Sequence, residues 1–202
     1  MSIPDHSDLP VDRCAGLETV AGLACTGTTA GLKASGAPDL ALVRVLGPEH
    51  TAAAVFTRNR FAAAPVLWSR EVVSDGRADA VVLNSGGANA CTGPEGFAAA
   101  HRTAEAAAEH LGIAAGDVLV CSTGLIGEQL PLEKLLAGLE RACGDLASDE
   151  AHARAAARAI MTTDTVPKQA GLTLATEQGE VHLAGIAKGA GMRAPGLATM
   201  LV

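Results

Sequence analysis

Short apolar runs separated by turn residues predict most of the β-strands of this chain. They are Leu40–Leu46, Thr51–Thr57, Pro65–Trp68, Ala80–Leu83 and Val118–Cys121. The last two are continuously apolar, which is typical of central strands that are covered on both faces. Gly47–His50 has the composition of a turn, so the pattern predicts that the first two runs form a hairpin.

Apolar residues at helical spacing predict three helices later in the chain. Glu95–Leu111 is rich in alanine, and Gly112 follows it as a C-cap. Leu132–Ala142 carries its leucines along one side. A third helix is predicted from Asp149 to about Met161, with Ser148 as its N-cap and acidic residues in its first turn.

Strand patterns return at both ends of the chain. Leu172–Ala175 and Val181–Ile186 predict a hairpin, and Cys14–Lys33 predicts loops and short strands. Strands and helices alternate between these ends, which favours a layered α/β or α+β domain whose sheet is not purely parallel. The polar residues 1–13 are predicted to form a flexible lead to that domain.

Composition narrows the class of function. The net charge is −7 and aromatic residues make up 2% of the chain, which argues against binding to the phosphates or bases of nucleic acids. No apolar run is long enough to cross a membrane, and the first residues do not resemble a signal peptide. The five cysteines form no C-x-x-C pair and the six histidines are dispersed, so we expect a cytoplasmic protein with no metal site.

Two polar stretches are candidates for chemistry. Val120–Gly124 leaves a buried strand with two hydroxyls, which either help backbone N–H groups to hold an oxyanion or, more commonly, cap the next element. Met161–Thr165 ends a helix with three hydroxyls and an acid. These either line a polar pocket or form a C-terminal turn that Pro167 stops. Composition leaves these alternatives open.

A third candidate is the Ala198–Thr199 bond near the end of the sequence. No histidine or aspartate lies close to Thr199 in sequence to activate its hydroxyl. If the bond is cut, the new α-amine has a reference pKa of about 8 and can accept the proton of that hydroxyl. The same hydroxyl can make the cut if the glycines and Pro195 before it strain the backbone. Otherwise, Thr199 only fills a strand or helix.

These stretches resemble, in the same order, motifs of the ornithine acetyltransferase family (ArgJ type, glutamate N-acetyltransferase). The matching segments are Val55–Pro65, Asn84–Gly93, Ser122–Gly127, Ile160–Thr165 and Lys188–Leu201. The resemblance runs from about Leu17 to the end of the sequence. It implies an ArgJ/DmpA-like fold of the N-terminal-nucleophile type, with sheets packed between helices.

The resemblance implies that the chain is a piece of a self-cleaving precursor. Cleavage between Ala198 and Thr199 would make residues 14–198 an α-chain domain and residues 199–202 the start of a β chain whose remainder is not in this sequence. The expected partner is that β chain, in an (αβ)n hetero-oligomer. This chain alone is expected to be inactive.

The resemblance also assigns roles to residues. Thr199 is the expected nucleophile, first for autocatalytic cleavage and then for acetyl transfer, and Thr123 and Gly124 correspond to the oxyanion hole. Thr162 and Lys188, together with Thr199, correspond to substrate-binding positions. The expected reaction of arginine biosynthesis moves an acetyl group from N2-acetylornithine to glutamate through an acetyl-Thr199 intermediate. It needs no cofactor, and acetyl-CoA is a co-substrate only if the enzyme is bifunctional.

The chain departs from the family pattern at two places, which leaves alternatives open. Gly87 stands where the family usually has asparagine, and Gly196–Leu197 replaces the usual Asn/Asp-Met before the cut. These changes are compatible with a paralogue of secondary metabolism that uses another acyl donor or acceptor. The further alternatives are a related N-terminal-threonine amidohydrolase, which passes the acyl group to water, and a non-enzymatic binding subunit.

Overall fold

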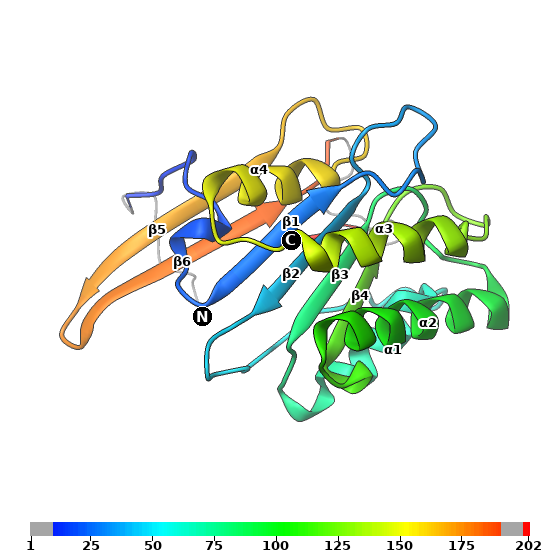
Figure 1. The fold of residues 1–202 in the computed structure, drawn as a ribbon, viewed down its shortest axis with the longest axis horizontal. Coiled ribbons are helices and arrows are strands. Elements are labelled where there is room, and N and C mark those ends of the chain that lie inside the picture. Colours follow the sequence, from blue (N-terminus) through cyan, green and yellow to red (C-terminus); the bar gives the residue numbers. More distant parts are fainter. Residues whose placement is uncertain (1–9, 191–199) are drawn as a thin grey trace.

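A four-stranded mixed sheet forms the centre of the computed structural model, which describes residues 10–190 and 200–202 (Figure 1). In spatial order its strands are β1 (Leu23–Thr28), β2 (Leu40–Val45), β3 (Ala80–Asn84) and β4 (Val118–Ser122). β1 and β3 both pair antiparallel with β2, whereas β3 and β4 are parallel. The mixed sheet confirms the prediction that the sheet is not purely parallel.

Helices α2 and α3 cover one face of this sheet. The α-helices are α1 (Ala64–Val72), α2 (Gly93–Leu111), α3 (Leu132–Gly144) and α4 (Glu150–Ala159), and short 3₁₀ helices lie at Leu17–Thr19, Val73–Asp75 and Ala115–Asp117. Leu42, Val82 and Val120 of the strands form one core with Leu111 of α2 and Leu139 of α3. Most other helix residues in this core are alanines, as expected from the scarcity of aromatic residues.

The other face of the sheet contacts α4 and a second sheet. This two-stranded sheet is the hairpin of β5 (Lys168–Thr176) and β6 (Gly179–Ala187), which projects beyond the central sheet in Figure 1. Ile160 after α4 and Ile186 of β6 share a buried cluster with Leu83 of β3. Gly27 of β1 permits a close contact with α4, because a Cβ atom there would lie 2.1 Å from the Ala155 carbonyl oxygen.

Two strand predictions in the region before β3 are wrong. Residues 52–59 have no regular structure, so β2 pairs with β1 and β3 instead of forming a hairpin with this segment. The predicted strand Pro65–Trp68 lies in α1, where Pro65 occupies the first turn. Short apolar runs do not distinguish strand from helix, and here contacts with β4 decide. Trp68 Nε1 donates to the Val118 carbonyl at 2.9 Å, and Ser69 Oγ donates to the Val120 carbonyl at 2.7 Å.

The remaining predictions differ mainly at the ends of elements. Gly112 is the left-handed C-cap of α2, as predicted, with φ of 67°. The N-cap of α4 is Asp149 instead of Ser148, because the Asp149 carboxylate accepts the His152 N–H at 3.0 Å. Ser148 Oγ instead donates to the Leu23 carbonyl at 2.6 Å. The predicted β5–β6 hairpin is confirmed, with longer strands than the pattern indicated.

Candidate functional site

The candidate site begins where β3 and β4 end side by side. Because the two strands are parallel, Asn84 and Ser122 are register partners at the same edge of the sheet. The next residue, Thr123, donates its backbone N–H to the Asn84 carbonyl at 2.9 Å. Asn84 Nδ2 donates to the Gly87 carbonyl at 3.0 Å, which folds the glycine-rich loop back against Thr123. Thr123 is therefore almost fully buried, with 1% of its surface exposed.

Gly124 turns the chain sharply after Thr123. Its φ of 134° is strongly disfavoured for residues with a side chain. A Cβ atom at Gly124 would also lie 2.8 Å from the Gly87 backbone nitrogen. Both conformation and packing therefore require glycine at position 124. Gly87 differs, because a Cβ atom there would meet only the mobile end of a side chain, Leu130 Cδ2 at 2.9 Å.

Lys188 reaches Thr123 from the end of β6. Its Nζ atom donates to Thr123 Oγ1 at 2.9 Å, across 65 residues of sequence. Its backbone N–H donates to the Leu201 carbonyl at 3.0 Å. Lys188 is buried, and this burial lowers the pKa of its ammonium group below the ordinary value. The charge of Asp164 acts in the opposite direction and that of Lys168 in the same direction.

This contact gives the Thr123 hydroxyl a defined polarity. A lysine ammonium group has only donors, so Thr123 Oγ1 must be the acceptor in the contact with Lys188. The hydroxyl proton of Thr123 is then available to donate, and the neighbouring cation strengthens that donor. A buried, polarised hydroxyl beside a sharp backbone turn is chemically suited to stabilising an oxyanion.

Asp164 ties the turn after α4 to the end of β6. One of its carboxylate oxygens accepts the Gly189 N–H at 2.8 Å, and the other accepts the Thr162 N–H at 3.2 Å. Lys168 at the start of β5 forms an ion pair with the same carboxylate, whose side chain has no exposed surface. Burial raises the pKa of Asp164, but these hydrogen bonds and the Lys168 charge outweigh it and lower the pKa to about 2.

A second buried acid orders the loop between β1 and β2 beside this turn. The Asp39 carboxylate accepts N–H groups from Ala30, Leu32 and Lys33 at 2.6, 2.6 and 3.0 Å. Lys33 Nζ then donates to the carbonyls of Pro38 and Met161, each at 2.7 Å. Burial lowers the pKa of Lys33, against the charges of Asp39 and Asp164. The loop is thereby fastened to the segment that carries Thr162.

The structure brings together four of the residues that the sequence motifs indicated. Thr123 contacts Lys188 directly, Gly124 follows Thr123, and Thr162 is linked to the Lys188 segment through the Asp164 carboxylate. Ala198 and Thr199 lie outside the described residues. Sequence reasoning gave no role to Asp164, Lys168, Lys33 or Asp39. Only Asp164 had a signal, as the acid within the hydroxyl-rich stretch Met161–Thr165.

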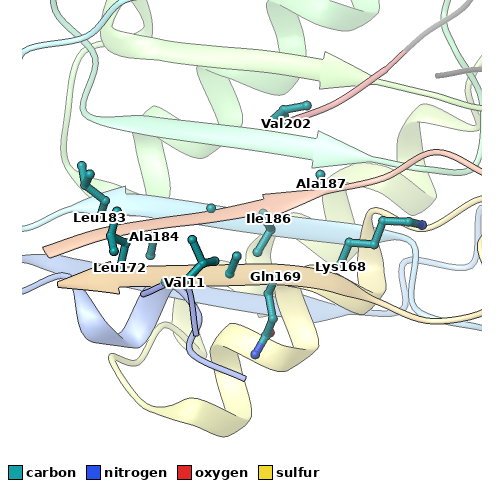
Figure 2. A pocket seen from close by; sticks show the side chains of 12 residues that line it. Val11, Lys168, Gln169, Leu172, Leu183, Ala184, Ile186, Ala187 and Val202 are labelled. Carbon is teal, nitrogen blue, oxygen red and sulfur yellow. The ribbon is translucent and has the colours of Figure 1, made fainter. Parts of the chain in front are cut away.

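A separate apolar hollow of about 390 Å³ lies along the β5–β6 hairpin (Figure 2). Leu172 and Leu183 are register partners, and Val11 and Val202 contribute further apolar side chains. Leu183 is 51% exposed and Val202 is 85% exposed. Thr123, Gly124 and Thr162 do not line this hollow. Its apolar lining suits packing against another chain segment better than binding of a charged amino acid.

Within residues 10–190 and 200–202, no group of three or more histidine, cysteine, aspartate or glutamate side chains is arranged to hold a metal ion. None of the helices in that part of the chain is both long and apolar enough to cross a membrane. Burial raises the pKa of the Cys121 thiol next to the site to about 11, so this thiol is a poor nucleophile at neutral pH.

Comparison with known proteins gives consistent matches. The model of the ArgJ family matches residues 24–202. The chain is 59% identical over 181 residues to the arginine biosynthesis bifunctional protein ArgJ of Streptomyces coelicolor, which covers 90% of this chain and 46% of that protein. It is 54% identical over 194 residues to the ArgJ protein of Mycobacterium tuberculosis, covering 94% and 47%. The chain thus spans about half the length of the curated relatives it matches.

A solved structure agrees in fold over nearly the whole chain. The crystal structure of ornithine acetyltransferase from M. tuberculosis, complexed with ornithine, superposes with a TM-score of 0.88 and 50% sequence identity. This match covers 95% of the present chain and 98% of the crystallised chain. That crystallised chain is therefore similar in length to this one, although the M. tuberculosis relative is about twice as long. The match confirms the α/β fold class expected from the sequence.

Proposed function

This chain belongs to the ArgJ family, and we propose that it is the upstream part of a self-cleaving acetyltransferase precursor of arginine biosynthesis. The complete enzyme would move the acetyl group of N2-acetylornithine to glutamate. The observation that carries this proposal is the buried contact between Lys188 Nζ and Thr123 Oγ1. It supports the proposal because a buried, polarised hydroxyl is suited to stabilising the oxyanion of an acyl-transfer reaction.

The contact between Leu201 and Lys188 supports a role for Thr199, which lies two positions before Leu201. Leu201 is buried, and its carbonyl accepts the backbone N–H of Lys188 at 3.0 Å. The segment that follows Thr199 is therefore fastened to the segment that carries the Lys188–Thr123 contact. The proposed nucleophile is Thr199, and the proposed cleavage site is the Ala198–Thr199 bond.

The proposed transfer is a two-step exchange at the Thr199 hydroxyl. The α-amine of Thr199, released by cleavage, takes the hydroxyl proton while the oxygen attacks the acetyl carbonyl carbon of N2-acetylornithine. The carbon–nitrogen bond then breaks, and the ornithine nitrogen leaves with that proton. In the second step the amine of glutamate attacks the acetyl-Thr199 ester, which gives N-acetylglutamate and restores the hydroxyl.

The other residues of the site would stabilise and orient these steps. Thr123 and Gly124 form the proposed oxyanion hole for the tetrahedral intermediate of each step. Lys188 supplies a compact positive charge that suits a substrate carboxylate, and Thr162 is the proposed second contact with substrate. No prosthetic group enters these steps. The cytoplasm is the expected location, where the five cysteines, which are all unbridged, remain reduced.

We propose that the downstream half of the precursor packs against the exposed side of the β5–β6 hairpin. That half would become the β chain and complete an (αβ)n assembly. Three observations support this placement: the apolar hollow along the hairpin, the exposure of Leu183 and Val202, and the relatives of about twice this length. We expect the activity to need both halves.

An assay of the full-length precursor with a Thr123→Val variant tests the proposed activity. We expect the wild type to convert N2-acetylornithine and glutamate into ornithine and N-acetylglutamate. We expect the variant, which loses the hydroxyl but keeps its shape, to have a kcat about 100-fold lower. Thr103→Val is the matched control, because Thr103 is equally buried but bonds only within α2, to the Ala99 carbonyl.

The products of this assay distinguish acetyl transfer to glutamate from hydrolysis and from the use of another acetyl donor. Release of acetate without N-acetylglutamate would indicate an amidohydrolase and contradict the proposed transfer. Formation of N-acetylglutamate from acetyl-CoA in place of N2-acetylornithine would add a second donor. Full activity of the Thr123→Val variant would contradict the proposed role of the Thr123 hydroxyl in stabilising the oxyanion.

A further inference from the structure

Asp164 joins the segments of the candidate site but takes no part in the chemistry proposed above. Its two carboxylate oxygens accept separate backbone N–H groups, one from Thr162 and one from Gly189. Gly189 directly follows Lys188, so one side chain connects the backbones that carry both proposed substrate-binding residues. The Asp164 side chain has no exposed surface, and within residues 10–190 and 200–202 its side-chain partner is Lys168.

Asp164 is a negative charge that interacts with all three lysines near the candidate site. Lys33 from the β1–β2 loop, Lys168 from β5 and Lys188 after β6 all interact electrostatically with it. The other acid nearby, Asp39, accepts three backbone N–H groups of its own loop and acts on Lys33. Among the residues that the structure describes, Asp164 stabilises the ammonium form of Lys188, whereas the charges of Lys33 and Lys168 oppose it.

We propose that Asp164 is a positioning residue, which holds Thr162 and Lys188 in register and sets a negative charge near the Lys188 ammonium, the proposed contact of an anionic substrate. This inference rests on the acetyl transfer proposed above. Asp164 acts through its neighbours and does not itself touch the reacting atoms. Its geometry suits this role because each carboxylate oxygen serves a different segment, so the distance between the segments is set by one rigid planar group.

An asparagine at position 164 would disturb both parts of the role. The amide retains one acceptor oxygen, and its NH₂ group would face one of the two backbone N–H donors. The charge that stabilises the Lys188 ammonium would also be lost. By contrast, Lys168→Met leaves both backbone hydrogen bonds of Asp164 intact and removes a positive charge that opposes the ammonium form of Lys188.

The test compares these two variants in the full-length precursor over a range of pH. We expect Asp164→Asn to raise the KM for glutamate about tenfold, with a smaller change in kcat, because a charged hydrogen-bonding partner of the binding segments is lost. The basic limb of the kcat/KM profile should move to lower pH in Asp164→Asn and to higher pH in Lys168→Met. Glu180→Gln, which removes an exposed acid at the far end of β6, should match the wild type.

A merely structural role of Asp164 would not move the basic limb of the kcat/KM profile in opposite directions in Asp164→Asn and Lys168→Met. An unchanged KM and an unchanged basic limb in Asp164→Asn would overturn the inference. If the wild-type precursor shows no acetyl transfer, the proposed function fails separately. An NMR titration of the Lys188 side chain in the present chain then decides the inference: a pKa that Asp164→Asn leaves unchanged would overturn it, and a lower pKa would support it.

Discussion

At the residue level, Gly124 combines two constraints that can be separated by mutation. Its φ of 134° and the 2.8 Å approach of the Gly87 nitrogen both exclude a Cβ atom. Gly127, three residues later, also has a positive φ, of 89°, but nothing lies within 4 Å of its missing Cβ. The pair therefore distinguishes backbone strain from close packing at the same loop.

We predict that Gly124→Ala lowers the free energy of unfolding by about 3 kcal/mol, because strain and a backbone contact add. Gly127→Ala should cost about 1 kcal/mol, from strain alone. Urea unfolding of the two variants beside the wild-type chain measures the difference. Equal costs would show that the approach of Gly87 to Gly124 does not constrain the site.

The Asp164 carboxylate should also make stability depend on pH. Its pKa is lowered from 3.8 to about 2, so its contribution is complete above pH 4 and is lost as the pH falls through 2. This shift corresponds to about 2 kcal/mol. We therefore predict that Asp164→Asn is less stable than the wild type by about this amount at pH 7, and that the gap narrows between pH 4 and pH 2. A constant gap would contradict the assigned pKa.

The sequence identified the residues that form the Lys188–Thr123 contact and the turn beside it, but not the residues that support them. Thr123, Gly124 and Lys188 belong to motifs with a recognisable order. Asp164 stands within such a motif, yet its role depends on Gly189, 25 residues away, and on the start of β5. Contacts of this kind arise from tertiary packing and leave no periodic signal along the chain.

At the level of elements, the contact between α4 and β1 depends on a single glycine. A Cβ atom at Gly27 would lie 2.1 Å from the Ala155 carbonyl oxygen and 2.6 Å from the Ala156 nitrogen. These are backbone atoms, so α4 would have to move as a unit. Since the turn that carries Thr162 and Asp164 follows α4, this packing also positions part of the candidate site.

We predict that Gly27→Ala lowers the free energy of unfolding by more than about 3 kcal/mol, because a rigid helix must be displaced. Gly185→Ala is the matched control within a strand, since nothing lies within 4 Å of its missing Cβ. It should be neutral within about 0.5 kcal/mol. Thermal unfolding followed by circular dichroism compares the two, and similar melting temperatures would refute the close contact.

Elements with a long, regular pattern were predictable, whereas short runs were not. α2 and α3 have enough turns for their periodicity to show, and β3 and β4 are continuously apolar because both faces are covered. Pro65–Trp68 is too short for its period to be read, and its helix is fixed by hydrogen bonds from Trp68 and Ser69 to β4. The sequence of α1 alone does not show that it will cover an edge strand.

At the level of the whole molecule, the exposed apolar side of the β5–β6 hairpin is the surface proposed to contact the downstream half. We predict that Leu183→Asp weakens association with the co-expressed downstream half at least tenfold, because a charge would be buried against apolar side chains. Leu46→Asp is the matched control, since Leu46 is 55% exposed and Leu183 is 51% exposed. Co-purification through a tag measures both, and equal recovery would place the partner elsewhere.

We propose that Thr199 cuts the precursor and that its newly freed α-amine then activates its hydroxyl as the nucleophile. Intact-mass spectrometry of the full-length precursor, beside its Thr199→Ala variant, tests this most directly. We expect two fragments divided between Ala198 and Thr199 in the wild type and a single uncut chain in the variant. A wild-type precursor that stays whole, or a variant that is cut at the same bond, would contradict it.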